Sequence, residues 1–151
     1  MVTVRPARRE DVEAIASLLG ELDQFYGASQ LEPLAERIAG TESALFTSPQ
    51  AASALLAWTG SSLSGLATYS FLWPAAGVTR SLYLKELYVA AANRRDGVGT
   101  RLMDEILNVA REQNCSRVEW TTETENVAAR QFYSTFGASL QDGKVLFRVA
   151  L

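Results

Sequence analysis

Apolar residues in the first third of the chain follow two different periods. In 2–6, apolar and polar residues alternate up to Pro6, which predicts a short strand. From Asp11 onward apolar residues recur every three or four positions, which predicts an amphipathic helix that fades around 25–27. A weaker helical pattern covers 31–38, and we expect Gly40 to stop it. The chain therefore opens with a strand and two helices.

Strand-like patterns dominate the middle of the chain. Two apolar, β-favouring runs at 52–59 and 63–73 are separated by a short polar turn, which predicts a hairpin. A third strand is expected at 81–89, where strict alternation would put Glu86 on one face with Leu82, Leu84 and Tyr88, and Lys85 on the other.

The last third alternates between helix and strand patterns. We expect a helix after the glycine-containing loop at 93–99, with its end near Asn114. The elements expected after it are a strand at 116–122, a helix at 126–136 closed by Gly137, and a hairpin at 139–151 that turns at Asp142-Gly143. No repeat or linker interrupts the order, so we expect a single domain over 1–151.

Composition narrows the chemistry. The chain has 151 residues, 48% apolar, which is enough for one domain with its own core. Its 14 basic and 17 acidic residues give a charge of -3, which argues against a nucleic-acid partner and favours a cationic substrate. With no histidine and only Cys115, the chain offers neither a Ser-His pair nor a zinc cluster, so no metal is expected. Without a signal-peptide or membrane-span pattern, we expect a cytoplasmic protein.

The segment Arg94-Arg95-Asp96-Gly97-Val98-Gly99 is the first candidate for a binding site. A strand that leads through this loop into a helix leaves unpaired N–H groups at the positive end of the helix dipole. Glycines let a ligand approach the backbone, and the arginines add charge, so the loop suits a pyrophosphate. The alternative is that Gly97 and Gly99 only permit a tight turn.

Three segments in order carry a family resemblance. They are Tyr83-Leu84-Lys85-Glu86-Leu87-Tyr88-Val89, then Arg94-x-x-Gly97-x-Gly99, then Asn126-x-x-Ala129-x-x-Phe132-Tyr133-x-x-x-Gly137. Together they resemble the GNAT N-acetyltransferase superfamily. The pattern is most similar to the diamine (spermidine/spermine-type) acetyltransferases, through Val4-Arg5-Pro6-Ala7 and Tyr69-Ser70-Phe71.

The resemblance implies an α/β fold of the α+β type. Its central mixed, mostly antiparallel sheet would have six to seven strands and about four flanking helices. The sheet would splay between its fourth and fifth strands, here 81–89 and 116–122, and acetyl-CoA would lie in the gap. The implied coenzyme-binding residues are Leu87, Tyr88, Val89, Arg94, Arg95, Asp96, Gly97, Val98, Gly99, Thr100, Asn126 and Tyr133. The resemblance also implies a homodimer that pairs through Val145–Leu151.

The residues of these motifs can support acetyl transfer. Glu86 could take the proton of the ammonium group if burial raises its pKa, although it could instead be a simple ion-pair partner of Lys85. Tyr133 could protonate the departing thiolate. The backbone N–H of Tyr88 or Val89 would meet the oxyanion.

The chain departs from its relatives in two places. Arg95 stands where many relatives have glycine, and Lys85 replaces the first of two consecutive acids in the diamine subgroup.

The acceptor site is expected to include Lys85, Glu86, Asp23, Tyr26 and Trp73. The sequence predicts an acetyltransferase for a small primary amine, such as a polyamine, diamine or amino-acid-like molecule. A protein or peptide acetyltransferase and a non-catalytic acyl-CoA sensor are the alternatives.

Overall fold

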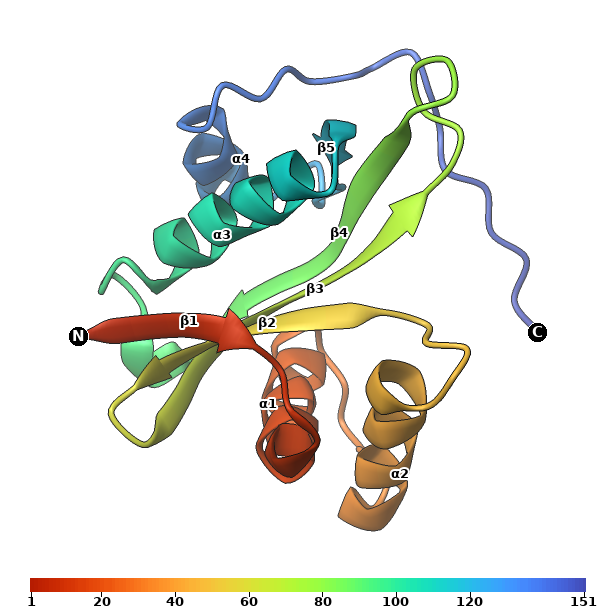
Figure 1. Ribbon diagram of the computed structural model, residues 1–151. Helices are drawn as coiled ribbons and strands as arrows, with labels where there is room; N and C mark the ends of the chain where they lie inside the picture. Colours follow the sequence, from red (N-terminus) through yellow and green to blue (C-terminus); the bar gives the residue numbers. More distant parts are fainter. The chain divides into compact units, whose positions relative to one another are not determined.

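A mixed five-stranded sheet in the order β1-β2-β3-β4-β5 organises the first 120 residues (Figure 1). The computed structural model describes residues 1–151 as two units, 1–120 and 121–151, which are treated separately below. The expectation of a single domain therefore stays a prediction. The strands are β1 (Val2–Pro6), β2 (Ser53–Thr59), β3 (Ser62–Leu72), β4 (Arg80–Val89) and β5 (Cys115–Glu119). Only the β4–β5 pair is parallel.

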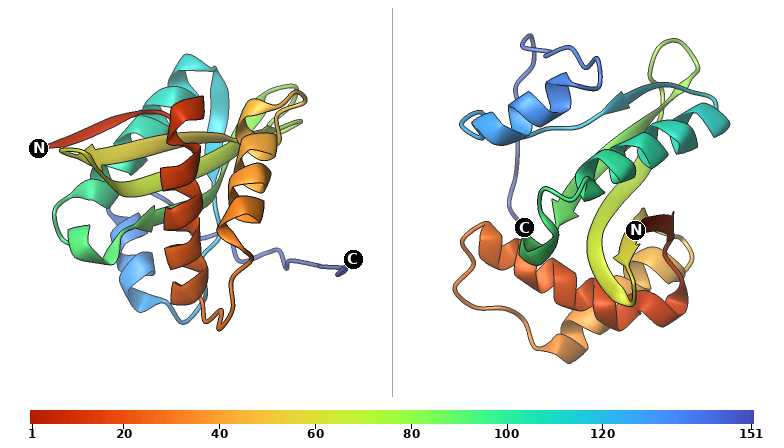
Figure 2. Two further views of the ribbon diagram at one scale, coloured as in Figure 1. Left: turned by 90° about the horizontal axis from the view of Figure 1, so that it is seen from below. Right: turned by 90° about the vertical axis from the view of Figure 1, so that its left-hand side faces the viewer.

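Helices cover both faces of this sheet (Figures 1 and 2). They are α1 (Val12–Phe25), α2 (Leu34–Phe46) and α3 (Val98–Glu112), with short 3-10 turns η1 (Arg9–Asp11) and η2 (Ala91–Asn93). One core joins Ile15 of α1 to Leu56 and Leu66 of the sheet. On the other face Val98 and Leu102 of α3 are 1% and 0% exposed. Each such side chain contributes about 1.5–3 kcal/mol by leaving water, so the apolar stripes fix both layers.

The second unit contains one helix, α4 (Val127–Ser134). The oxygen Oδ1 of Asn126 accepts a hydrogen bond from the Ala129 N–H at 3.1 Å and so caps the first turn. Gly137 follows the helix in the left-handed region, with φ of 73°. A glycine adopts this conformation without steric cost, which agrees with the helix end predicted there.

Two predicted elements are wrong. Gly40 does not stop a helix, because α2 runs through it and buries Thr41 and Leu45 beyond it. A glycine in a helix costs only about 1 kcal/mol, and burial of the following turn outweighs that cost. The C-terminal hairpin is absent as well: no strand forms in 121–151, so the sheet has five strands where six to seven were expected. An isolated hairpin is marginally stable without a third strand or a covering helix.

The remaining predicted elements are found within a few residues of their expected bounds, and the α+β class with a mixed, mostly antiparallel sheet is confirmed. None of the helices is long and apolar enough to cross a membrane. The cytoplasmic setting expected from the sequence stays a prediction.

Candidate active site

Strand β4 has a partner along only part of its outer edge. Its pairing with β5 takes in Arg80–Tyr83 and ends there, whereas its pairing with β3 continues to Val89. The half of β4 from Leu84 to Val89 therefore has no strand beside it on the β5 side. This is the divergence of the fourth and fifth strands that the family resemblance implied.

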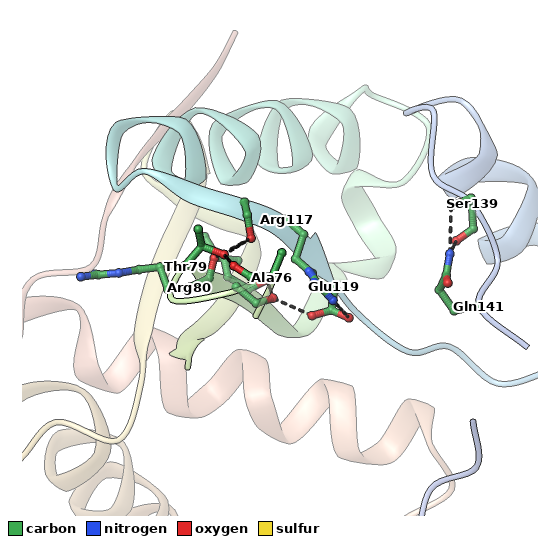
Figure 3. Close-up of polar contacts among 10 residues, drawn as sticks. Ala76, Thr79, Arg80, Arg117, Glu119, Ser139 and Gln141 are labelled. Carbon is green, nitrogen blue, oxygen red and sulfur yellow. Dashed lines mark hydrogen bonds and ion pairs between the residues drawn. The ribbon is translucent and has the colours of Figure 1, made fainter. Parts of the chain in front are cut away.

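Side chains hold the two strands together where they do pair (Figure 3). The buried Ser81 hydroxyl donates to Oε1 of Glu119 at 2.8 Å, and Arg117 lies 3.9 Å from the second oxygen of that carboxylate. The Thr79 hydroxyl donates to the Ser116 hydroxyl at 2.6 Å. These contacts all lie near the paired residues Arg80–Tyr83, so they stabilise the β4–β5 pair at that end, and the strands no longer pair beyond it.

The register of β3 and β4 decides which backbone groups face the open edge. The Ala90 N–H donates to the Ser64 carbonyl at 2.9 Å, so Ala90 directs its backbone groups toward β3. Because these groups alternate along an antiparallel ladder, those of Tyr88 also face β3 and those of Leu87 and Val89 face away. Consistently, the Val89 carbonyl accepts from Nε of Arg94 at 3.2 Å.

The N-terminus of α3 presents free backbone donors. The first hydrogen bond of the helix runs from the Arg101 N–H to the Gly97 carbonyl at 3.1 Å, so the N–H groups of 98–100 have no acceptor inside the helix. Gly97 has φ of 77°, and a Cβ placed on it would meet no atom within 4 Å. The positive helix end is therefore open to a ligand and suits an anion.

Glu86 and Lys85 lie at an irregularity in β4. Thr68 pairs with Glu86 and Tyr69 with Leu84, so Lys85 is the extra residue of a β-bulge and the alternation expected along 81–89 is interrupted there. The Glu86 side chain is 26% exposed and that of Lys85 is 70% exposed. Nζ of Lys85 lies 3.4 Å from Oε1 of Glu86, a solvent-facing contact worth less than about 1 kcal/mol. Both roles predicted for Glu86, as a base and as an ion-pair partner, stay open.

Residues predicted for the acceptor site are distributed over two regions. Asp23 accepts from Nη2 of Arg37 at 3.1 Å, and Tyr26 follows α1 with its side chain largely exposed. Trp73 lies just beyond the end of β3. It is five residues from Thr68, which pairs with Glu86, and five strand residues span about 16 Å. Its Nε1 donates to the Val78 carbonyl at 2.9 Å, so the fold does not bring Trp73 to Glu86.

Tyr133 of α4 is half-buried, and its ring centre lies 5.3 Å from that of Phe132. Asn126 uses Oδ1 for its helix cap. Both residues belong to the second unit, so their predicted place beside the coenzyme stays a prediction.

One residue of the first unit was missed by the sequence analysis. Glu21 of α1 accepts a hydrogen bond from the Tyr88 hydroxyl at 2.7 Å, although the two residues are 67 positions apart. Burial and the neighbouring Glu21 carboxylate raise the pKa of Tyr88, so its hydroxyl stays protonated. No spacing along the chain signals such a contact, because it depends on how α1 packs on the sheet.

Comparison with known proteins is consistent with this geometry. Residues 16–138 match the Acetyltransferase (GNAT) family. The thialysine N-epsilon-acetyltransferase of Sus scrofa is 29% identical over 79 residues, 52% of this chain and 46% of that protein. The match thus spans about half the length of this relative.

Two solved structures share the fold over nearly the whole chain. An integron cassette protein from the mobile metagenome of V. cholerae has a TM-score of 0.90 and 26% identity, covering 99% of this chain and 92% of its own. The aminoglycoside N-acetyltransferase AAC(6')-Iy in complex with CoA has a TM-score of 0.80 and 16% identity, covering 100% of this chain and 96% of its own. Together with the family match over residues 16–138, the motifs and the open edge of β4 establish that the chain belongs to the acetyltransferase (GNAT) family.

Proposed function

We propose that the protein is an acetyl-CoA-dependent N-acetyltransferase that acts on a primary amine. The observation that carries the proposal is the edge of β4 left without a partner beyond Tyr83, followed in the chain by a helix with free N–H groups. Membership of the GNAT family supports it. The fold shared with a solved aminoglycoside N-acetyltransferase in complex with CoA is further support.

The residues present fit a coenzyme with amide and pyrophosphate groups. The backbone groups of Leu87 and Val89 face the open edge and can pair with the pantetheine amides. The N–H groups of the segment Arg94–Thr100 are the candidates for the pyrophosphate, and the absence of a Cβ at Gly97 leaves room for it. Asn126 and Tyr133 are proposed to lie near the thioester. When bound, the coenzyme supplies the acetyl group in activated form.

Two side chains are proposed to move protons. Glu86 takes a proton from the substrate ammonium and so frees the nitrogen lone pair. That nitrogen bonds to the acetyl carbon while the carbon–sulfur bond breaks, and the Tyr133 hydroxyl gives its proton to the sulfur. The nitrogen of the new amide then releases its second proton to solvent. Glu86 loses its proton to solvent and Tyr133 regains one from it, so both residues return to their starting protonation states. Of the two N–H groups considered for the oxyanion, that of Val89 faces the open edge and that of Tyr88 faces β3, which favours Val89.

The acceptor is proposed to be a small primary amine of the polyamine, diamine or amino-acid-like class. The chain carries a net charge of -3, which favours a cationic molecule. The matched relative is named for acetylation of an ε-amine of thialysine. The proposed lining of the acceptor site consists of Asp23 and Tyr26 near the end of α1, with Lys85 and Glu86 of β4. Trp73 is the least supported residue of this set because of its distance from Glu86 along β3.

A homodimer through the C-terminal segment is also proposed. The large apolar side chains of this segment are each at least 75% exposed: Leu140, Val145, Leu146, Phe147, Val149 and Leu151. A second copy would cover them, because a row of this kind is uncommon on a monomer. Light scattering should give twice the chain mass for the wild type and a lower mass for Phe147→Asp. A wild-type monomer at micromolar concentration would refute the dimer.

The catalytic proposal is tested by thiol release from acetyl-CoA with a panel of diamines, amino acids and peptides. We expect turnover with a small amine, and kcat lowered by about 10²–10⁴-fold in Tyr133→Phe and in Glu86→Gln. Tyr83→Phe is the matched control for Tyr133→Phe, since Tyr83 lies on the part of β4 that pairs with β5; it should act like wild type.

Other outcomes lead to other functions. Turnover with peptides alone would make the protein a peptide acetyltransferase, and coenzyme binding without turnover on any amine would make it a sensor. If acetyl-CoA produced no thermal shift, the proposed coenzyme site would be wrong.

Lys85→Glu should raise diamine activity if Lys85 selects against a second positive charge; unchanged activity would remove Lys85 from the acceptor site.

A further inference from the structure

A series of polar contacts joins helix α1 to Arg94, the first residue of the glycine loop Arg94–Gly99. The same oxygen of Glu21, Oε2, accepts from the Tyr88 hydroxyl at 2.7 Å and from the Ala91 N–H at 3.1 Å. The Tyr88 hydroxyl in turn accepts from Nη2 of Arg94 at 3.2 Å. Glu21 thus contacts the end of β4 and the start of η2, and reaches Arg94 through a single hydroxyl group.

Two aromatic rings lie beside the guanidinium of Arg94, a residue that is itself exposed. Its central carbon lies 4.9 Å from the ring centre of Phe25 and 5.5 Å from that of Tyr88. These two rings lie 5.9 Å apart, and Nε of Arg94 donates to the Val89 carbonyl. The side chain is therefore held by two hydrogen bonds and two cation–π contacts. A guanidinium held in this way links the start of the loop to α1 and β4.

The loop that follows needs such support. Arg95 and Gly97 both have positive φ, 69° and 77°. A non-glycine residue in the left-handed region costs about 1–2 kcal/mol and persists only where surrounding contacts impose it. This conformation leads the chain from β4 into α3, whose first turn carries the free N–H groups of 98–100. Arg94 is the residue directly before the strained position, so its contacts are the nearest ones that can impose it.

From these contacts we propose that Glu21 is a positioning residue for the glycine loop, acting through the Tyr88 hydroxyl and Arg94. This inference rests on the proposed function, since it assumes that the loop binds the pyrophosphate of coenzyme A. The carboxylate of Glu21 balances the charge of Arg94 through the shared hydroxyl, and both hydrogen bonds in the series are charge-assisted. Loss of any member should loosen the loop and weaken coenzyme binding while leaving the proton-transfer residues in place.

The experiment is a double-mutant cycle in the full chain, read as the Kd of coenzyme A by calorimetry. Glu21→Ala, Tyr88→Phe and Arg94→Ala should each weaken binding by about 5–10-fold. The double variant Glu21→Ala/Arg94→Ala should bind coenzyme A no more than about twofold more weakly than either single variant, because the two residues act through the same series of hydrogen bonds. Glu21→Gln should recover most of the affinity, since its amide oxygen can still accept from Tyr88 and Ala91.

Kinetics and controls separate positioning from a general loss of stability. In Glu21→Ala the KM for acetyl-CoA should rise while kcat stays within about twofold, as expected when only binding is lost. Glu13→Ala, an exposed carboxylate on the first turn of the same helix, should bind coenzyme A like wild type.

Three results would overturn the inference. They are wild-type affinity in Tyr88→Phe, additive losses in the double variant, and a fall in kcat without a rise in KM. Failure of the wild type to bind coenzyme A would instead refute the proposed function itself.

Discussion

Gly65 on β3 offers a sharp test of how α3 is placed over the sheet. A Cβ at this position would lie 2.9 Å from Cγ1 of Val98, 3.0 Å from the Tyr88 carbonyl oxygen and 3.1 Å from Cδ1 of Leu102. Ordinary contacts begin near 3.4 Å, so all three neighbours are too close. Val98 and Leu102 are 1% and 0% exposed, so other atoms surround both side chains. The third neighbour is backbone of β4.

Gly65→Ala must therefore push α3 outward or separate β3 from β4. Overpacking of this kind costs about 1–3 kcal/mol, a large part of the 5–15 kcal/mol that stabilises a typical domain. Because Val98 is the first residue of α3, the shift also moves the free N–H groups of the helix end. We expect coenzyme A to bind about 3–10-fold more weakly, in line with 1 kcal/mol or so of lost interaction.

Urea unfolding followed by circular dichroism measures the stability change, and calorimetry measures the coenzyme affinity. Gly40→Ala is the matched control, since Gly40 lies inside α2 and a Cβ there would meet no atom within 4 Å. It should gain about 0.5–1 kcal/mol from helix propensity alone. If Gly65→Ala unfolds within about 0.5 kcal/mol of wild type, α3 does not pack on β3 in the manner described.

Three further predictions concern the first unit. Asp11→Asn should cost about 2–3 kcal/mol at pH 7, because Asp11 is buried and both of its oxygens accept from Arg5 at 2.7 and 2.9 Å. Arg5 lowers the pKa of Asp11, so this contribution is present above about pH 4 and is lost as pH falls through the lowered value. The urea midpoints of the variant and wild type should therefore converge as the pH falls, and a constant difference would contradict this. Arg95→Gly should raise the unfolding free energy by about 0.5–1 kcal/mol by relieving a φ of 69°, and a lower midpoint would count against that backbone conformation. Ser81→Ala should cost about 1 kcal/mol and speed hydrogen exchange in β5, because it removes the hydrogen bond to Glu119; unchanged exchange would show that this contact does not hold the strands together.

Local patterns in the sequence were sufficient for most of the elements. The three-and-four spacing of apolar residues predicted α1 and α3, and the alternating runs predicted β1 to β4, because burial of one face is encoded in neighbouring residues. The glycine loop was predicted for the same reason, since a strand, two glycines and a helix are all local signals. The family followed from three such segments in order.

Other features depend on contacts between residues far apart in the chain. Gly40 was misjudged because burial of Thr41 and Leu45 is a tertiary gain that outweighs helix propensity. The C-terminal residues alternate like a hairpin, yet a strand forms only where a partner is available to pair with it. Neither partner nor burial can be read from the segment itself.

The glycine loop and its surroundings show the same division. The sequence by itself predicted an anion site after β4, since the residues that would create it are consecutive. Only the tertiary structure decided that β5 leaves β4 after Tyr83, that Leu87 and Val89 face the open edge, and that Glu21 supports Arg94. Strand register and helix packing set these relations, and both are chosen by the summed contacts of the whole unit rather than by any one segment.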